Sequence, residues 1–268
     1  MRAVVWERLT RNRLFLDQTD TPLEIDRTQV ERFYHPLAST LLSRCSSLPR
    51  FLVAIAGPPG SGKTALATIL VAVINAEAGN EVAVSIGLDG WHYPNAYLSS
   101  HTLERDGKQI TLRDIKGAPE TFDATAAYRC LLQVRQGGRI SFPVYSRRLH
   151  EPVARGGYVD PAHKIVVVEG NYLLLDEEPW RRFRPLFDIR MYISASPDTL
   201  IASLERRHRR GGKTPDAIAR HIREVDLPNA RRVAPGAAYA HILVHKVDDR
   251  HIARLEWLVE DQNGMTKV

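Results

Sequence analysis

An eight-residue run, Gly57-Pro58-Pro59-Gly60-Ser61-Gly62-Lys63-Thr64, has the residue types and spacing of a loop that binds nucleotide phosphates. Glycines let the backbone turn its N–H groups inward around phosphate oxygens, and a helix that follows adds its positive dipole end. Lys63 can bridge the β- and γ-phosphates, and the Thr64 hydroxyl can ligate Mg²⁺. We therefore expect ATP and Mg²⁺ as ligands, with nucleotide contacts from Gly57, Pro58, Gly60, Ser61, Gly62, Lys63, Thr64 and Ala65.

Two carboxylates directly follow apolar runs elsewhere in the chain. Glu169 comes after the run at 165–168, and a carboxylate beside the phosphate-binding strand is the usual second partner of the metal. Glu169 is therefore predicted to hold Mg²⁺ together with Thr64. Asp89 follows the run at 82–88, where it could accept the proton of an attacking hydroxyl. Asp-Gly is also a common turn dipeptide, so the residues alone leave both roles open for Asp89.

The hydropathy pattern indicates the scaffold that would position these residues. We expect helices at 28–45, 65–78, 124–136 (capped by Asp123), from 196 or 198 to 210, from 214 onward and at 252–259, and strands at 51–56, 82–88, 140–145, 165–168, 189–193 and 242–244. Strands that are apolar throughout and alternate with helices predict an α/β fold, with a mainly parallel sheet covered on both faces. Ligands of such sheets bind at the carboxyl ends of the strands, here Gly57, Asp89, Tyr145 and Glu169. The long polar stretch at 91–122 is predicted to be a functional loop.

The composition is that of an ordinary globular protein of one domain, residues 1–268, with 44% hydrophobic and 25% charged residues. Its net charge of +6 suits either a nucleic acid or a site for phosphates. The basic residues cluster only at 206–213, which favours a small phosphorylated ligand over nucleic acid. Two cysteines make no disulfide framework, and neither a signal peptide nor a membrane span is apparent. We therefore expect a cytoplasmic protein with no nucleic-acid or membrane partner.

Four segments occur in a characteristic order: Asp89-Gly90-Trp91-His92-Tyr93-Pro94-Asn95, Lys116-Gly117-Ala118-Pro119-Glu120-Thr121-Phe122-Asp123, Pro143-Val144-Tyr145-Ser146 and Val168-Glu169-Gly170-Asn171. In this order the sequence resembles the phosphoribulokinase/uridine kinase/type I pantothenate kinase family, most closely its bacterial sugar-kinase-like and pantothenate-kinase-like members. The segment Phe33-Tyr34-His35-Pro36-Leu37-Ala38 adds to the resemblance, which spans residues from about 30 to 245. The resemblance implies a three-layer P-loop NTPase fold with a helical lid at 206–226, a substrate loop at 91–122 and an N-terminal helical extension at 1–48.

The resemblance also implies roles for particular residues. It implies that Asp89 is the catalytic base and that Thr64 and Glu169 bind the metal. It also implies that Arg206 and Arg210 of the lid bind the transferred phosphate. Tyr145 and His150 match substrate-contacting positions, and Asn229 and Val233 match positions that pack the nucleotide base. The full set of expected substrate contacts is Trp91, His92, Tyr93, Asn95, Arg113, Lys116, Tyr145, His150 and Asn171.

Some of these expectations have alternatives. Arg113 and Lys116 could equally be solvated surface charges. Trp91, Tyr93 and Tyr145 could form an aromatic face for a ring, since a polar loop is a poor place to bury them. His208 and His221 are given no role, and no His/Cys spacing suggests zinc.

The function expected from these residues is in-line transfer of the γ-phosphoryl group of MgATP to a small-molecule hydroxyl. A sugar, a nucleoside and a pantothenate-like alcohol all remain open as acceptors, because Asp89-Gly90-Trp91-His92 departs from both the uridine kinase and the pantothenate kinase pattern. The alternatives are a nucleotide-dependent switch or ATPase without an acceptor, and a nucleic-acid-binding protein. By analogy with the family, a homodimer is possible.

Overall fold

The computed structural model describes residues 3–11, 13–16, 22–45, 49–105 and 107–258. The helices are α1 (Ala3–Arg11), α2 (Arg27–Gln29), α3 (His35–Arg44), α4 (Lys63–Ala78), α5 (Asn95–Ser100), α6 (Ala124–Gln136), α7 (Pro197–Arg210), α8 (Pro215–His221) and α9 (Leu227–Val233). The strands are β1 (Leu14–Phe15), β2 (Pro22–Leu23), β3 (Phe51–Ala56), β4 (Ala83–Gly87), β5 (Thr102–Arg105), β6 (Lys108–Thr111), β7 (Ile140–Ser146), β8 (Glu151–Val159), β9 (Ile165–Glu169), β10 (Ile189–Ser194), β11 (Ile242–Lys246) and β12 (Ile252–Trp257). Short 3₁₀ or π turns link several of them, among them η1 (Val30–Tyr34), η3 (Leu88–Trp91), η5 (Trp180–Leu186) and η6 (Ile222–Asp226).

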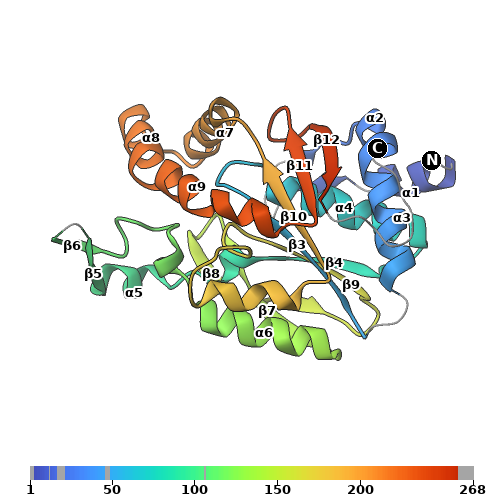
Figure 1. Cartoon of the computed structure of the whole chain (residues 1–268), viewed down its shortest axis with the longest axis horizontal. Helices are drawn as coiled ribbons and strands as arrows, with labels where there is room; N and C mark the ends of the chain where they lie inside the picture. Colours follow the sequence, from blue (N-terminus) through green and yellow to red (C-terminus); the bar gives the residue numbers. More distant parts are fainter. Residues whose placement is uncertain (1–2, 12, 17–21, 46–48, 106, 259–268) are drawn as a thin grey trace.

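A six-stranded sheet in the order β12-β11-β10-β3-β9-β4 forms the middle layer of the described chain (Figure 1). Neighbouring strands from β11 to β4 pair in parallel, and β12 pairs antiparallel with β11 at the edge. The parallel strands have apolar residues on both faces because helices cover both sides. The predicted mainly parallel, three-layer α/β fold is therefore confirmed.

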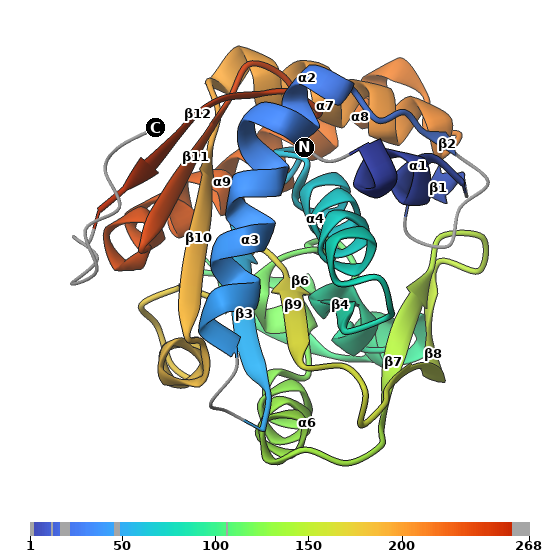
Figure 2. The ribbon, with the colours of Figure 1, turned by 90° about the vertical axis from the view of Figure 1, so that its right-hand side faces the viewer.

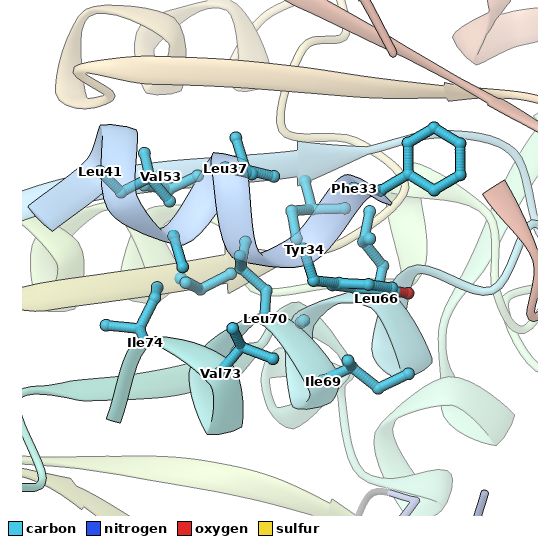
Figure 3. Close-up of a cluster of buried hydrophobic side chains, with 14 of the residues drawn as sticks. Phe33, Tyr34, Leu37, Leu41, Val53, Leu66, Ile69, Leu70, Val73 and Ile74 are labelled. Carbon is cyan, nitrogen blue, oxygen red and sulfur yellow. The ribbon is translucent and has the colours of Figure 1, made fainter. Parts of the chain in front are cut away.

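The residues of β3 supply both of the cores that lie on either side of the sheet. Val53 and Ile55 face the core against α3 and α4, whereas Leu52, Ala54 and Ala56 face the core against α6 and η5. Figure 3 shows the first core, in which side chains of α3 and of the turn before it interlock with side chains along one face of α4. This packing holds the start of α4 rigidly at the carboxyl end of β3, where the glycine-rich loop joins them.

The helix expected at 28–45 is present as a continuous run from α2 through a π turn to α3, and it packs on α4 (Figure 2). The structure adds elements that the sequence pattern did not predict. Helix α1 buries Val5 and Leu9 against the same core, and its Arg8 donates to the Ala76 carbonyl. Strands β1 and β2 form a short antiparallel pair. The N-terminal extension therefore thickens the α3–α4 layer.

Three sequence-based predictions about secondary structure were wrong. The last helix expected at 252–259 is instead strand β12, paired with β11 from Ile242 opposite Trp257; Val259 lies outside the described residues. Strand β7 does not join the central sheet but pairs with β8 in a separate hairpin. The stretch at 91–122 contains α5, the β5–β6 hairpin and a small apolar cluster of its own, because Leu98, Leu112 and Ile115 are buried together.

Two capped helices occupy the region where a lid was predicted. The side chain of Ser196 caps α7, and that of Thr214 caps α8, as their hydroxyls accept from Thr199 and Ala217 backbone N–H groups. Figure 1 shows α8 and the β5–β6 hairpin extending at the same end of the molecule. Within the described ranges, no helix has the length and apolar character needed to cross a bilayer.

Candidate active site

The glycine-rich loop closes on itself at the N-terminus of α4. Gly60 and Gly62 have φ of +79°, and a Cβ on Gly62 would lie 2.0 Å from the Asp249 carbonyl oxygen, so only glycine fits there. The buried Lys63 ammonium donates to the Pro58 carbonyl at 2.9 Å. The Ser61 hydroxyl is buried in the loop with no hydrogen-bond partner among the described residues. These donors suit an anion with several acceptor oxygens.

Thr64 and Glu169 meet as the sequence predicted. Glu169 ends β9, in register with Ile55 of β3 and Gly87 of β4, so it lies between the strand that leads to the loop and the strand that leads to Asp89. The Thr64 hydroxyl donates to Glu169 Oε1 at 3.0 Å. One hydroxyl and one nearly buried carboxylate are oxygen donors of the kind that Mg²⁺ prefers, so these residues fit the metal.

Asp89 lies in the 3₁₀ turn η3, two residues beyond the end of β4. This turn packs tightly on β7, because a Cβ on Gly90 would lie 2.0 Å from the Pro143 carbonyl oxygen. The close approach brings Arg147, just after β7, to Asp89: its Nη2 donates to Asp89 Oδ2 at 2.7 Å. The Asp89 side chain keeps 33% of its accessible surface, so an acceptor hydroxyl can reach it.

The cations near Asp89 decide its charge. Burial alone would raise the pKa of Asp89, but Arg147, His92, Arg207 and Lys63 together outweigh it and lower the pKa from 3.8 to about 2. Burial lowers the pKa of the His92 ring, and the charge of Asp89 opposes that shift. Asp89 is therefore ionised near neutral pH. Its carboxylate can accept the proton of an attacking hydroxyl in the transition state.

Arg207, which the sequence analysis did not select, is the lid arginine whose charge acts on the pKa of Asp89. Burial lowers the pKa of Arg207, and Asp226, Asp89 and Glu169 oppose that shift. Its guanidinium is 3.4 Å from Asp226. Arg206, which was selected, instead donates to Asp249 at 2.8 Å on another side of α7. Arg206 and Arg207 project differently because consecutive residues of a helix point about 100° apart.

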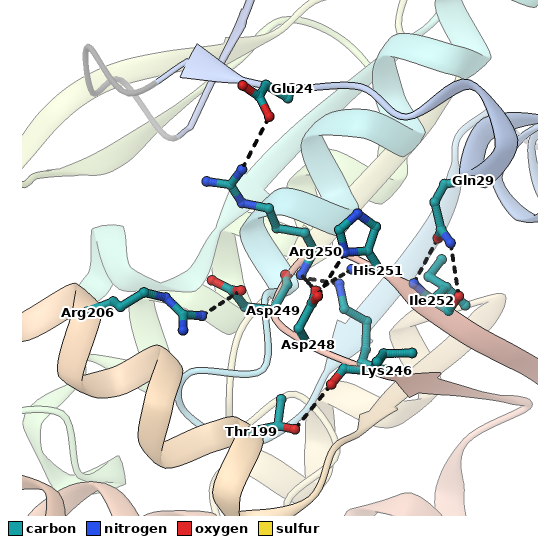
Figure 4. A network of polar contacts seen from close by, with 11 residues as sticks. Glu24, Gln29, Thr199, Arg206, Lys246, Asp248, Asp249, Arg250, His251 and Ile252 are labelled. Atoms are coloured by element: carbon teal, nitrogen blue, oxygen red, sulfur yellow. Dashed lines mark hydrogen bonds and ion pairs between the residues drawn. The ribbon is translucent and has the colours of Figure 1, made fainter.

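A pocket of about 650 Å³ opens between α7 and the turn that follows β11. It is lined by Arg206, Arg209, Arg210, Asp248, Asp249 and Arg250. Figure 4 shows how polar contacts hold this turn: Arg206 contacts Asp249, Asp248 bonds to His251, and Arg250 reaches Glu24. Asp249 also abuts Gly62, so the pocket adjoins the phosphate-binding loop.

The packing of a nucleotide base by Asn229 and Val233 stays a prediction. Both side chains are buried, Val233 within the core on the α6 side of the sheet, and neither is among the residues that line the pocket beside the loop. Arg210, which was selected for the transferred phosphate, does line that pocket.

Several of the expected substrate residues gather next to Asp89. The His92 ring stacks on Phe122 and lies 5.3 Å from the Tyr145 ring. The Lys116 ammonium lies 5.1 Å from the Tyr145 ring centre and donates to Asn95 Oδ1 at 2.7 Å and to the His150 carbonyl at 3.0 Å. Asn95 thus braces Lys116 and the turn at His150.

Asn171 and Arg113 lie at the margins of this group. Asn171 hydrogen-bonds to the hydroxyl of Tyr172, which itself donates to the Gly117 carbonyl and so ties the 91–122 segment to the end of β9. Arg113 is exposed, and its charge influences the pKa of both Tyr145 and Lys116.

The aromatic face expected from Trp91, Tyr93 and Tyr145 does not form. Trp91 is 5% exposed and packs into the core on the α6 side of the sheet. Tyr93 stacks on Tyr97, with ring centres 4.3 Å apart, over the small cluster around Leu98. Trp91 thus belongs to the main core, and Tyr93 to the smaller cluster of the 91–122 segment. Of the three rings, only that of Tyr145 lies next to His92 and Arg147.

His208 and His221, to which the sequence analysis gave no role, join Asp226 in the lid. His208 Nε2 is 2.8 Å from Asp226 Oδ2, and His221 Nε2 is 4.0 Å from the same oxygen. Burial lowers the pKa of His221 to about 4, so its ring is neutral. Since Asp226 also pairs with Arg207, this cluster connects α7 and η6 and steadies the arginine that faces Asp89.

Arg147, Arg207, Arg209 and the turn at 248–250 are site residues that sequence reasoning missed. Arg147 and Arg207 had available signals: the first stands two residues after Tyr145, and the second lies within the basic run of α7. The turn at 248–250 carried none, since its place beside the loop depends on the pairing of β11 with β10.

A glycine-rich loop between a buried parallel strand and a helix, with Thr64 and Glu169 joined behind it, defines a protein of the P-loop NTPase class. The comparisons narrow this class. The model of the phosphoribulokinase/uridine kinase family matches residues 52–253. YggC of Escherichia coli (strain K12), itself uncharacterised, is 30% identical over 223 residues, covering 82% of this chain and 89% of YggC. Pantothenate kinase of Enterococcus faecalis is 27% identical over 232 residues, 78% of this chain and 73% of that enzyme.

A crystal structure agrees with these sequence relatives. A chain from Silicibacter sp. TM1040, provisionally named a fructose transport system kinase, matches with a TM-score of 0.66 and 31% identity, covering 75% of this chain and 94% of that chain. The protein therefore belongs to the phosphoribulokinase/uridine kinase family. It is an ATP-dependent phosphotransferase with an alcohol group as acceptor.

Proposed function

We propose that this protein transfers the γ-phosphoryl group of MgATP to a hydroxyl of a sugar, nucleoside or pantothenate-like small molecule, with Asp89 as the general base. The observation that carries the proposal is a convergence of charges on Asp89: Arg147 lies 2.7 Å from its carboxylate, and Lys63 and Arg207 are near enough to lower its pKa. These groups come from the loop after β3, from α7 and from the turn after β7. The ends of different elements therefore converge on one carboxylate, as phosphoryl transfer requires.

The donor side follows from the loop and its pocket. The loop amides and Lys63 would bind the phosphates, and the base and ribose would occupy the pocket lined by Arg206 and Asp249. Thr64 and Glu169 would hold Mg²⁺, which supplies positive charge to the β- and γ-phosphate oxygens when bound. The Arg207 guanidinium would face the transferred group and neutralise its developing charge.

The acceptor side is formed by Asp89 and by residues of the 91–122 segment. Asp89 would accept the hydroxyl proton, and His92, whose Nδ1 lies 2.9 Å from the Asp89 backbone carbonyl oxygen, would steady the turn that carries the base. We interpret 91–122 as the substrate loop and 206–226 as the lid of a single domain. The position of one hollow supports the view that the substrate loop and the lid act together. This hollow, of about 530 Å³, is lined by Asp114 of the substrate loop and by residues of the lid between 213 and 225. Closure there would exclude water from the transfer.

An ADP-release assay over a panel of sugars, nucleosides and pantothenate tests this function. We expect ADP release to depend on one class of acceptor and to match the phosphorylated product one for one. Equal ADP release with and without any acceptor would contradict the proposal and would support a nucleotide-dependent ATPase or switch.

Substitution of the two neighbouring lid arginines should separate their roles. Arg207→Ala is expected to lower kcat by about 100-fold, because it removes a charge that faces the transferred phosphoryl group. Arg206→Ala should mainly raise the KM for ATP, because Arg206 lines the nucleotide pocket. Steady-state kinetics for both, with the exposed Arg223→Ala as control, measures the split. Similar effects of Arg206→Ala and Arg207→Ala on kcat would contradict the separate roles given to these two arginines.

A further inference from the structure

Three cationic side chains lie around the ring of Tyr145, beside Asp89. The Arg147 guanidinium carbon and the Lys116 ammonium are each 5.1 Å from the ring centre. The third, Arg113, is close enough for its charge to influence the pKa of Tyr145 and of Lys116. Together they give the acceptor side of Asp89 a positive charge. Their presence on the acceptor side of Asp89 therefore carries information about the acceptor.

The contact between Arg147 and Asp89 is the sharpest of these observations. Arg147 Nη2 lies 2.7 Å from Asp89 Oδ2, and the two side chains keep 41% and 33% of their accessible surface. An acceptor hydroxyl that reaches Asp89 must therefore come to a carboxylate that already shares an oxygen with a guanidinium. The remaining N–H groups of a guanidinium form a planar fork that matches a carboxylate or phosphate.

Lys116 lies on the same ring and is held in position. Its ammonium donates to Asn95 Oδ1 and to the His150 carbonyl, both of them uncharged acceptors. Glu151 lies near enough to raise the pKa of Lys116, but its carboxylate oxygens accept from the Asn95 backbone N–H. The charge of Lys116 is thus oriented by neutral groups and adds to the charge of Arg147.

From these contacts we infer that the acceptor is an alcohol with an anionic group, a carboxylate or a phosphate, close to the reacting hydroxyl, and that Arg147, assisted by Lys116, binds this group. The inference rests on the proposed kinase function and narrows its acceptor. The hydroxyl and the anion must be separated by few bonds, since Asp89 and Arg147 are in direct contact.

Matched pairs of acceptors test this inference: D-glycerate with glycerol for a carboxylate, and ribose 5-phosphate with ribose for a phosphate. For at least one pair we expect kcat/KM of the wild-type enzyme to favour the anionic member by roughly 10- to 100-fold, the range of a charge-assisted hydrogen bond. The pair that shows the preference identifies the anion. Binding of each compound, measured by calorimetry in the presence of MgADP, gives a readout that needs no turnover.

Variants of Arg147 identify the residue responsible. Arg147→Gln should abolish the preference by raising KM for the anionic member, and Arg147→Lys should keep part of it, since lysine is a point charge without the fork. The neighbouring Arg148→Gln removes the same charge from an exposed side chain and serves as the matched control. Arg147 also lowers the pKa of Asp89, so its loss can change kcat for every acceptor. The measurement that tests the inference is therefore the ratio of kcat/KM between the two members of a pair.

The outcomes separate the inference from the function on which it rests. Turnover of neutral nucleosides or sugars with no preference for an anionic partner would overturn the inference and leave the kinase function intact. So would an equal loss of kcat/KM for both members of a pair in Arg147→Gln. Acceptor-independent ATP hydrolysis, with no binding of any anionic compound, would overturn both.

Discussion

Asp89→Asn is expected to lower kcat by about 100- to 10,000-fold, the usual contribution of a general base. The amide is nearly isosteric with the carboxylate but cannot accept the hydroxyl proton at neutral pH. Affinity for ATP should change little, because the phosphate-binding loop and the pocket beside α7 make no contact through Asp89. Single-turnover phosphorylation and nucleotide binding by calorimetry, each with wild type and variant, measure the two effects separately.

The control for this variant is Asp198→Asn, which removes the same charge from an exposed position in the first turn of α7. Thermal unfolding of both variants checks that the loss of the Arg147 ion pair has not unfolded η3. Near wild-type turnover in a folded Asp89→Asn protein would remove Asp89 from the role of base. In that case the pair with Arg147 would be a structural contact between η3 and β7.

The donor half of the site could be predicted because its residues are local in the sequence. Gly57 to Thr64 form a continuous loop whose neighbours, a buried strand and a helix, are strong patterns in themselves. Glu169 could be predicted because β9 is apolar up to its last residue, which is this glutamate. Parallel neighbours end at the same edge of a sheet, so residues that are far apart in sequence meet there.

The acceptor half depends on packing that no local pattern reports. Trp91 follows the base by two residues and was expected in the site, yet its ring packs into the core on the α6 side of the sheet. Tyr93 instead packs on the separate small cluster of Leu98, Leu112 and Ile115. Arg147 reaches Asp89 only because Gly90 lets η3 approach β7. The apolar spacing at 252–257 suited a helix, but the open edge of β11 selects a strand there.

Lys63→Ala should weaken ATP binding and turnover together, with kcat lowered by about 100- to 1,000-fold. The reason lies in the position of Lys63, a buried cation at the first residue of α4 that is held by the Pro58 carbonyl within the loop. Burial lowers the pKa of this ammonium, and Glu169 opposes that shift, so the charge is retained beside the expected metal ligands. A cation in that place interacts with ATP in the ground state and with the transferred phosphoryl group in the transition state.

The comparison with Asp89→Asn gives this prediction its sharpest form. If Lys63 belongs to the donor half and Asp89 to the acceptor half, only Lys63→Ala should change the Kd for ATP, whereas both variants should lower kcat. Lys164→Ala is the matched control. Lys164 is exposed and directly precedes β9, so it lies at the opposite end of that strand from Glu169. An unchanged Kd for ATP in a folded Lys63→Ala protein would show that the loop amides and the helix dipole alone hold the phosphates, and that Lys63 acts only on the transferred group.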